Sequence, residues 1–429
     1  METEFDSSDS LKSIYGMGPE YRPRSIAELS VRESVLEDIA LKNLYLYGPY
    51  SLADFSEQSR ISYDAAEQLF SHLRAKLLCE ATGMTGTVPH IAITSQGRTH
   101  ALELLSQNQY SGAMPVSLAS YVAQVRKQSM RNVKVQPDDV KRAFAHLVFD
   151  DEALSNMGTA LNSGNAVFLY GPPGVGKTAA AEAMCHVFSE DEIYVPFAIE
   201  IAGQIITVYD PAIHGTTVET PSQDEDRRWA RCGRPTVVVG GELTIDMLDL
   251  QFNPTSKFYD SPPQMKANNG VLVIDDFGRQ RVAPEELLNR WVVPLDRGIE
   301  FLTLAGGRKI EIPFETLVVF ATNRDPKSIL DSAFLRRIQT KIRLGAITDD
   351  QFSEIFHRVA RSHQLSVDQN VLNDLIRTIR SDLKEDLRAC QPRDLVNQVC
   401  WRATYEERRP RLDRESLLRA VGAYFLSSS

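Results

Sequence analysis

The chain has 429 residues, 43% of them hydrophobic and 24% charged, and its formal net charge is −10. The length predicts about two or three domains, and the composition is typical of a soluble globular protein. The acidic balance argues against charge-driven coating of nucleic acid. No apolar run approaches the roughly 20 residues needed to cross a bilayer, and the acidic N-terminal segment is unlike a secretory signal. We therefore expect a cytoplasmic protein that does not insert into a membrane.

Cysteine and histidine usage indicates neither disulfides nor a metal centre. The five cysteines are scattered without a CxxC pair, and the eight histidines form no HExxH motif and no metal-ligand spacing. We therefore expect reduced thiols and no zinc site.

The N-terminal quarter divides into a tail and a helical module. Residues 1–25 lack periodicity and are rich in Ser, Asp, Gly and Pro, which predicts a disordered tail. Residues 26–110 predict three helices, a short strand with a turn at 91–98, and a further helix; Ser51 to Asp54 can cap the second helix. The apolar positions at helical spacing are Val35, Leu36, Ile39, Ala66, Leu69, Phe70, Leu73, Leu77, Ala101, Leu102 and Leu105.

This order of elements resembles a winged-helix domain, and residues 93–98 are similar to the wing end of many bacterial regulators. In that family the third helix enters the major groove of DNA. Here that helix region carries Arg74 and Lys76 but also Asp64 and Glu67, whereas phosphate neutralisation needs clustered cations. We therefore favour protein docking over DNA reading for this winged-helix-like module. Residues 111–134 are expected to be a linker, with a helix within 111–130.

A glycine-rich loop follows an apolar stretch at 166–170 and precedes a helix. Its residues are Gly171, Pro172, Pro173, Gly174, Val175, Gly176, Lys177 and Thr178. Glycines let backbone N–H groups turn inward around an anion, and the new helix points its positive end at the same place. The motif predicts an ATP-binding phosphate loop in which Lys177 reaches the β- and γ-phosphates and Thr178 binds Mg²⁺.

Two further apolar strands end in polar residues. The strand at 271–274 ends in Asp275 and Asp276, and four consecutive apolar residues predict a buried parallel strand with the acids at its carboxyl end. We expect Asp275 to hold Mg²⁺ and Asp276 to orient and polarise the attacking water. The strand at 317–322 ends in Asn323, an uncharged donor suited to positioning that water.

Three arginines further along the chain are candidate phosphate contacts. Arg336 and Arg337 follow a short helix; they lie either on solvated surface or in a neighbouring subunit's site, where guanidinium stabilises the charge on a transferring phosphoryl group. We prefer Arg337 as the catalytic one because it precedes the apolar Ile338. Arg393 stands at the start of a later helix.

Together these blocks resemble the AAA+ ATPase superfamily, whose Walker A, Walker B, sensor 1, arginine finger and sensor 2 they match in order. The resemblance implies a doubly wound α/β nucleotide-binding domain with a parallel sheet at 135–345 and a helical lid at 346–429. Thr348 to Gln351 form a capping box at the first lid helix. The resemblance also implies ATP and Mg²⁺ as cofactors and a homo-oligomeric ring, expected to be a hexamer.

Strands at 299–304 and 308–312 flank a Gly-Gly turn and predict a hairpin. It is similar to the pre-sensor-1 hairpin of one AAA+ branch, and residues 269–323 read like the MoxR-type chaperone ATPases; a surface decoration is the alternative. Asp276 departs from the Glu that the superfamily usually has there, and its shorter reach can lower the hydrolysis rate. A second hairpin is predicted with arms at 194–201 and 204–209, and Phe258 with Tyr259 is read as a core pair rather than a pore lining.

The leading hypothesis is an ATP hydrolase that couples Mg-ATP binding and hydrolysis in a ring to remodelling of a protein client, which the N-terminal module selects. The rival is an ATP-switched DNA-binding protein of initiator or regulator type, with DNA as the partner. The Asp275–Asp276 pair and the winged-helix resemblance favour the rival, whereas the acidic balance and the hairpin oppose it. The client and its pathway are not indicated by the sequence.

Overall fold

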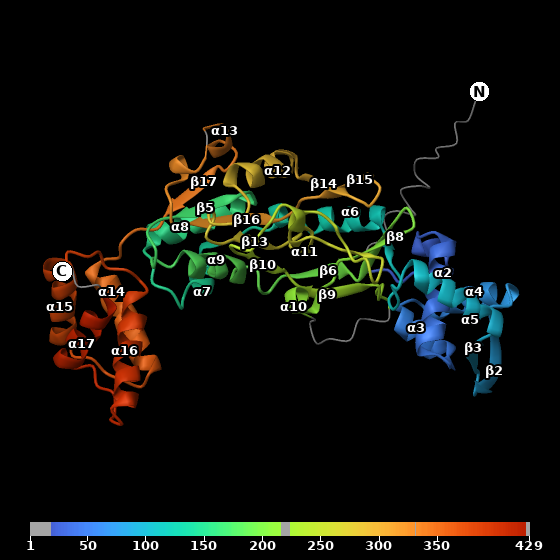
Figure 1. The fold of residues 1–429 in the computed structure, drawn as a ribbon, viewed down its shortest axis with the longest axis horizontal. Helices are drawn as coiled ribbons and strands as arrows, with labels where there is room; N and C mark the ends of the chain where they lie inside the picture. The colour runs from blue at the N-terminus through green and yellow to red at the C-terminus, as the bar shows by residue number, and fades with distance from the viewer. Residues whose placement is uncertain (1–18, 216–223, 331, 426–429) are drawn as a thin grey trace.

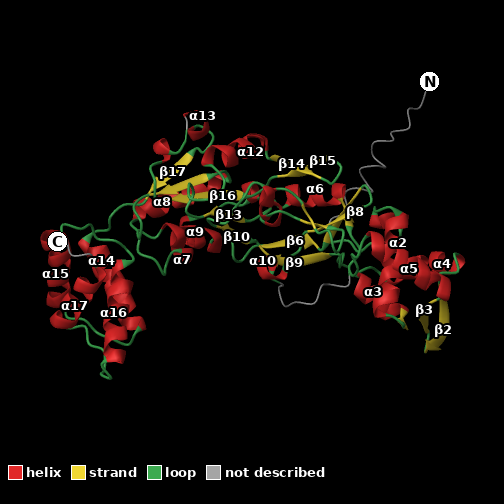
Figure 2. Cartoon of the chain, viewed as in Figure 1, coloured by secondary structure: helices red, strands yellow, loops and turns green. Residues whose placement is uncertain are grey.

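The computed structural model describes residues 19–215, 224–330 and 332–425. They form three parts along the long axis: an N-terminal unit at one end, a central α/β part, and a C-terminal helical unit at the other end (Figure 1). Most strands lie in the central part (Figure 2). Of the predicted tail at 1–25, residues 1–18 lie outside the described residues, as do residues 426–429. No helix within the described ranges has both the length and the apolar character needed to cross a membrane.

The N-terminal unit combines helices with a three-stranded antiparallel sheet of order β1-β3-β2. Its elements are η1 (Ala27–Leu29), α2 (Glu33–Tyr47), β1 (Tyr50–Ser51), α3 (Leu52–Ser59), α4 (Tyr63–Ala75), β2 (Cys79–Thr85), β3 (Val88–Ile93) and α5 (Ser95–Gln107). Ser51 and Asp54 form the reciprocal capping box of α3, as predicted. The sequence missed β2, because its residues after Cys79 are exposed and show no apolar alternation.

Leu77 was wrongly assigned to the apolar stripe of the third helix. The helix α4 ends at Ala75, and Leu77 has a left-handed φ of 61° and a side chain that is 68% exposed. Leu78, which is 8% exposed, takes the buried place instead. The helical period fails here because the chain turns toward β2 before another helical turn is complete.

The central part contains a five-stranded parallel sheet of order β10-β13-β16-β5-β17. Its strands are β10 (Thr236–Val239), β13 (Val271–Ile274), β16 (Leu317–Thr322), β5 (Val167–Tyr170) and β17 (Thr340–Arg343). Residues Val167 and Leu169 of β5 pack with α7 (Pro137–Ala143), α8 (Asp151–Ser163) and α9 (Lys177–His186). Phe168 packs on the other face, together with α12 (Pro284–Arg297). Both faces are covered, which explains the continuous apolar strands and establishes the predicted doubly wound α/β fold.

A second five-stranded sheet, here called the insertion sheet, has the order β11-β12-β8-β7-β4. Its strands are β4 (Val116–Ser117), β7 (Ala198–Ile201), β8 (Gln204–Thr207), β11 (Gln251–Phe252) and β12 (Tyr259–Asp260). β7 and β8 pair antiparallel and confirm the predicted hairpin on both sides of its turn. Only the start of its first arm is wrong, because residues 194–196 belong to β6 (Glu192–Pro196), a separate strand that pairs with β9 (Trp229–Gly233). The stretch 111–134, expected to be a linker with one helix, contains that helix as α6 (Leu118–Lys127) and also contributes β4 and η2 (Met130–Asn132).

The aromatic pair before β13 lies in the core, as predicted. Tyr259 is 2% exposed, and its hydroxyl accepts a hydrogen bond of 2.7 Å from the Ala305 amide. Phe258 packs against the core of the N-terminal unit, with its ring 5.6 Å from that of Tyr110 in an edge-on arrangement. Neither residue is placed to line a pore.

The predicted hairpin before β16 is confirmed. β14 (Ile299–Thr303) pairs antiparallel with β15 (Lys309–Pro313), and Gly306 and Gly307 take left-handed φ values of 91° and 81° in the turn. Leu302, Ile310 and Ile312 pack into the core beneath the insertion sheet. The hairpin directly follows α12, which covers one face of the parallel sheet, and it packs against the insertion sheet. It therefore links the two sheets.

Glu300 on β14 gives the hairpin a pH-dependent stability. The residue is 1% exposed, and burial raises the pKa of Glu300 to about 7, although Arg290 lies 2.9 Å away and opposes the shift. The folded protein therefore holds this proton more tightly than the unfolded chain does. The stabilisation is complete below about pH 4.5 and is lost as the pH rises through about 7.

We expect Glu300→Gln to remove this pH dependence. The free energy of unfolding of the variant minus that of the wild type should increase by up to about 3 kcal/mol from about pH 5 to about pH 8. Urea unfolding at both pH values measures the difference, and Glu311→Gln, on the exposed face of β15, controls for the change in net charge. If the difference in unfolding free energy between Glu300→Gln and the wild type were the same at both pH values, as expected for Glu311→Gln, Glu300 would not titrate as stated.

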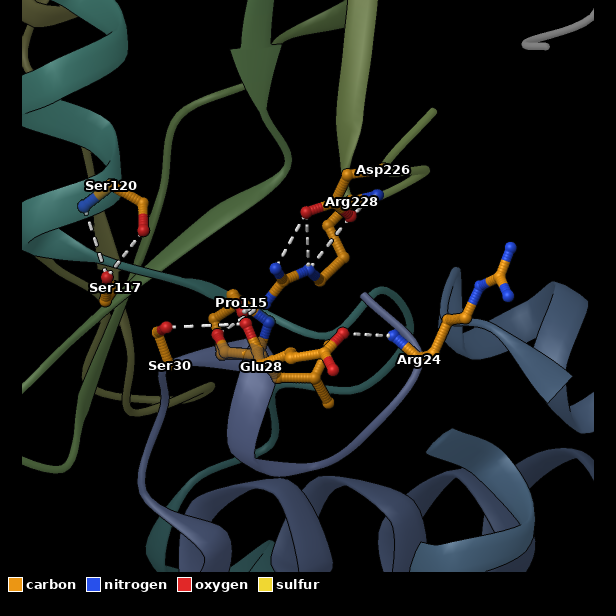
Figure 3. Close-up of polar contacts among 9 residues, drawn as sticks. Arg24, Glu28, Ser30, Pro115, Ser117, Ser120, Asp226 and Arg228 are labelled. Atoms are coloured by element: carbon orange, nitrogen blue, oxygen red, sulfur yellow. Dashed lines mark hydrogen bonds and ion pairs between the residues drawn. The ribbon is translucent and has the colours of Figure 1, made fainter. Parts of the chain in front are cut away.

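The charged segment 224–228 fastens the N-terminal unit to the central part (Figure 3). Arg228 and Asp226 form a buried ion pair with side chains 5% and 7% exposed and an Nη2–Oδ2 distance of 2.7 Å. Arg228 also donates to the carbonyls of Leu29, at 2.9 Å, and Pro115, at 3.1 Å. The Asp226 amide donates to the Pro19 carbonyl at 2.8 Å. The N-terminal unit is thus docked onto the insertion sheet, and the segment that sequence reasoning left unassigned makes the joint.

The C-terminal unit is helical. Its helices are α14 (Asp349–Ser362), α15 (Gln369–Arg377), the π-helical turn η5 (Thr378–Asp382), α16 (Gln391–Tyr405) and α17 (Arg414–Tyr424). Thr348 and Gln351 form the predicted capping box of α14. Phe352, Phe356 and Leu372 lie at the centre of its own apolar core.

Candidate nucleotide site

The glycine-rich loop lies between β5 and α9, at the carboxyl edge of the parallel sheet. Gly171 has a φ of 152°, and a Cβ there would overlap the carbonyl oxygen of Leu344, so only glycine fits. Val175 is buried and anchors the loop in the core on one face of the sheet. The N-terminal end of α9, where its backbone N–H groups are not bonded within the helix, faces the loop.

Lys177 is buried at the base of the loop. Its side-chain nitrogen donates to the carbonyls of Gly171, at 3.1 Å, and Pro172, at 2.8 Å, and to Oδ1 of Asn323, at 2.6 Å. Burial lowers the pKa of Lys177, and the carboxylates of Asp276 and Asp275 oppose that shift. A desolvated cation held by neutral oxygens binds an incoming anion more strongly than a solvated lysine does.

The residues predicted at the strand ends meet beside Lys177. The Thr178 hydroxyl donates to Oδ2 of Asp275 at 3.0 Å, joining the two expected Mg²⁺ ligands. Asn323 donates from Nδ2 to Oδ1 of Asp276 at 2.8 Å, so its amide links that carboxylate to Lys177. This convergence follows from the parallel pairing of β13, β16 and β5, whose carboxyl ends share one edge.

Asp276 has a strained backbone. Its φ is 48°, in the left-handed region that non-glycine residues seldom occupy, and its amide donates to Oδ1 of Asp275 at 2.9 Å. The turn brings the Asp276 side chain away from the strand axis and toward Asn323. The side chain is exposed, as a group that contacts water must be.

Arg336 and Arg337 follow the short helix α13 (Ser332–Leu335), beyond the parallel sheet. Nε of Arg337 lies 2.9 Å from Oδ2 of Asp296, and its guanidinium lies 5.9 Å from the ring centroid of Phe334. Within its own chain Arg337 thus pairs with the last turn of α12. Its predicted role in the site of a neighbouring subunit stays a prediction, because that contact requires a second chain.

The C-terminal unit contacts the glycine-rich loop through the start of α16. The Cys390 amide donates to the Gly174 carbonyl at 3.0 Å, and a Cβ on Gly174, whose φ is 80°, would lie 2.5 Å from the Cys390 sulfur. The predicted contact Arg393 lies on α16 near this end, with a side chain 68% exposed and Nε 3.5 Å from Oδ1 of Asp394.

Sequence reasoning missed Arg388. Its Cδ lies 3.7 Å from the position that a Cβ on Gly174 would take, so the side chain lies against the glycine-rich loop. Nη2 pairs with Glu385 at 3.1 Å, while Nε is buried with no hydrogen-bond partner in the described part of the chain. The only available signal was its place just before the helix that carries Arg393.

The exposed face of α4 does not favour the DNA-binding alternative. Asp64 and Glu67 are exposed on it together with Arg74, so acidic and basic side chains are mixed. Lys76, next to the end of α4, pairs with Glu37 at 2.6 Å. A helix that reads the major groove needs a cationic surface toward the phosphates, and this face does not supply one.

Comparisons with known proteins yield one family model and several solved structures. A family model described as a domain of unknown function (DUF8689) matches residues 348–423, within the C-terminal unit. No curated protein sequence matches the chain.

Two solved structures illustrate the likeness. The RuvB Holliday junction branch migration motor of Thermotoga maritima is 17% identical to this chain. The match covers 68% of this chain and 73% of the RuvB chain, with a TM-score of 0.38. NtrX from Brucella abortus in complex with ADP is 13% identical to this chain. The match covers 77% of this chain and 68% of the NtrX chain, with a TM-score of 0.41.

Proposed function

We propose that this chain is an ATP hydrolase of the AAA+ type. The observation that carries the proposal is the meeting of Lys177, Thr178, Asp275, Asp276 and Asn323 at one sheet edge, beside the start of α9. A buried cation, two hard-oxygen ligands, a carboxylate facing solvent and a neutral amide form the set that phosphoryl transfer to water requires.

The residues present fit Mg-ATP. Thr178 and Asp275 already lie within 3.0 Å and offer the hydroxyl and carboxylate oxygens that Mg²⁺ prefers. The open glycine-rich loop and the start of α9 suit the phosphates, and Lys177 can exchange its bonds to loop carbonyls for bonds to phosphate oxygens. When bound, the metal neutralises charge on the phosphates.

Asp276 is the residue that polarises the attacking water in this proposal. Its carboxylate is exposed and is held in place by Nδ2 of Asn323. Because the same amide accepts from Lys177, a shift of the lysine toward phosphate also releases Asn323 to bind the water or the γ-phosphate. The bridge thus couples occupancy of the loop to the position of the base.

We further propose that the chain acts as a homo-oligomeric ring that remodels a protein client. Arg337, or its neighbour Arg336, would complete the site of the adjacent subunit, and the C-terminal unit would act as the lid through its contact with Gly174. The hairpin β14–β15 and the docked N-terminal unit share the insertion sheet as their support. This continuity supports a MoxR-like use of the hairpin and client selection by the winged-helix-like N-terminal unit.

Nucleotide binding by wild type and Lys177→Ala tests the proposal. We expect the wild type to bind a fluorescent ATP analogue in the presence of Mg²⁺ and to release phosphate, and the variant to lose at least most of that binding because the buried cation is gone. Lys327→Ala, which removes an exposed lysine after strand β16 and outside the glycine-rich loop, is the matched control. A wild type that binds no adenine nucleotide with Mg²⁺ would overturn the proposal.

A further inference from the structure

Three side chains of metal-ligand type meet in the N-terminal unit, at the far end of the molecule from the C-terminal unit (Figure 1). Glu33 and Glu37 lie one helical turn apart on α2, and His72 lies on α4, which packs against α2. One ligand atom from each residue lies within 4.8 Å of the other two. Nδ1 of His72 is 2.6 Å from Oε1 of Glu33 and 3.8 Å from Oε1 of Glu37.

Glu37 indicates that the cluster is more than a surface ion pair. Its side chain is only 9% exposed, and its Oε2 accepts from Lys76 at 2.6 Å. Its Oε1 is buried and has no hydrogen-bond partner anywhere in residues 19–215, 224–330 and 332–425, although it faces His72 and Glu33. A buried carboxylate oxygen without a partner costs free energy, so a ligand between these atoms would stabilise the unit.

We propose that Glu33, Glu37 and His72 bind one divalent transition-metal ion of the zinc class. An imidazole nitrogen with two carboxylate oxygens suits zinc, whereas Mg²⁺ and Ca²⁺ take oxygen ligands. Three protein ligands leave a position for water. Lys76 holds the outer oxygen of Glu37 and thereby directs the inner one, the role of an outer-shell partner.

The position of the site points to a structural role. The ion would join α2 to α4, the two helices that carry much of the N-terminal core, and would stabilise the unit that is docked onto the insertion sheet. The sequence could not reveal it, because the ligands lie on two helices separated along the chain and show no local ligand spacing. The prediction that the chain has no zinc site rested on local motifs alone.

Zinc titration of the metal-stripped full chain by calorimetry tests the proposal, with excess MgCl₂ present to fill oxygen-only sites. We expect His72→Ala and Glu37→Gln each to weaken zinc binding by more than the roughly 10- to 100-fold that loss of an outer-shell partner costs. His100→Ala is the matched control, because His100 lies in the same unit, is 44% exposed and likewise pairs with an acid, Glu103, at 3.3 Å. It should bind zinc as the wild type does.

The variants separate the site from adventitious zinc binding. His72 is 43% exposed and Glu37→Gln keeps the shape of the side chain, so both variants should fold, which thermal unfolding without metal verifies. Zinc should raise the unfolding temperature of the wild type and of His100→Ala but not of the other two. Wild-type zinc affinity in either His72→Ala or Glu37→Gln would overturn the proposal, as would a wild type that binds no zinc.

Discussion

Asp276→Asn is expected to bind ATP normally and to lower kcat by about 10²- to 10⁴-fold, the range that a general base supplies. The substitution is unusually clean at this position. Asn tolerates the left-handed backbone, here with a φ of 48°, better than most residues do. Its carbonyl oxygen can still accept the 2.8 Å hydrogen bond from Asn323. The change therefore removes the negative charge and leaves the bonding pattern intact.

Phosphate release and equilibrium binding of an ATP analogue measure the two effects separately. Asp275→Asn is the matched control one residue away, and it should instead weaken Mg²⁺-dependent binding, because it removes the acid bonded to Thr178. An Asp276→Asn enzyme that turns over at the wild-type rate would assign the role of base to another group. If the variant traps the ATP state, affinity capture with it also identifies the client.

The sequence anticipated those parts of the fold whose signals are local. The strands β5, β13 and β16 are continuous apolar runs because both of their faces are buried, and each was predicted. The edge strands β10 and β17 were not predicted. Val238 of β10 is 48% exposed between two buried valines, and in β17 only Ile342 is buried, so neither strand is a continuously buried apolar run.

The residues of the site also divide into those that local sequence signals predict and those that they do not. Residues that end predicted parallel strands were found because topology forces their ends together, as with Asp276 and Asn323. Arg388 and the cluster around His72 were missed because they depend on how separate helices pack. The role of the segment 224–228 could likewise not be predicted, since its partners Leu29 and Pro115 lie far away in the sequence.

Arg337→Ala is expected to lower kcat by about 10³- to 10⁵-fold with little change in ATP affinity, if its guanidinium acts on the neighbouring subunit's phosphates. In the single chain Arg337 is held by Asp296 at 2.9 Å. It must leave this partner, or share it, when it reaches across an interface. Arg336→Ala is the matched control, and the larger loss of the two identifies the finger.

Mixing variants tests whether the arginine acts in trans. Arg337→Ala subunits keep an intact glycine-rich loop, and Lys177→Ala subunits keep the arginine, so a mixed ring contains some complete sites. We expect the mixture to hydrolyse ATP faster than either variant alone. Asp296→Asn distinguishes a purely structural role, because it breaks the same ion pair while leaving the guanidinium in place. If Asp296→Asn lost as much activity as Arg337→Ala and mixing restored none, the arginine would support its own fold and not a neighbour's site.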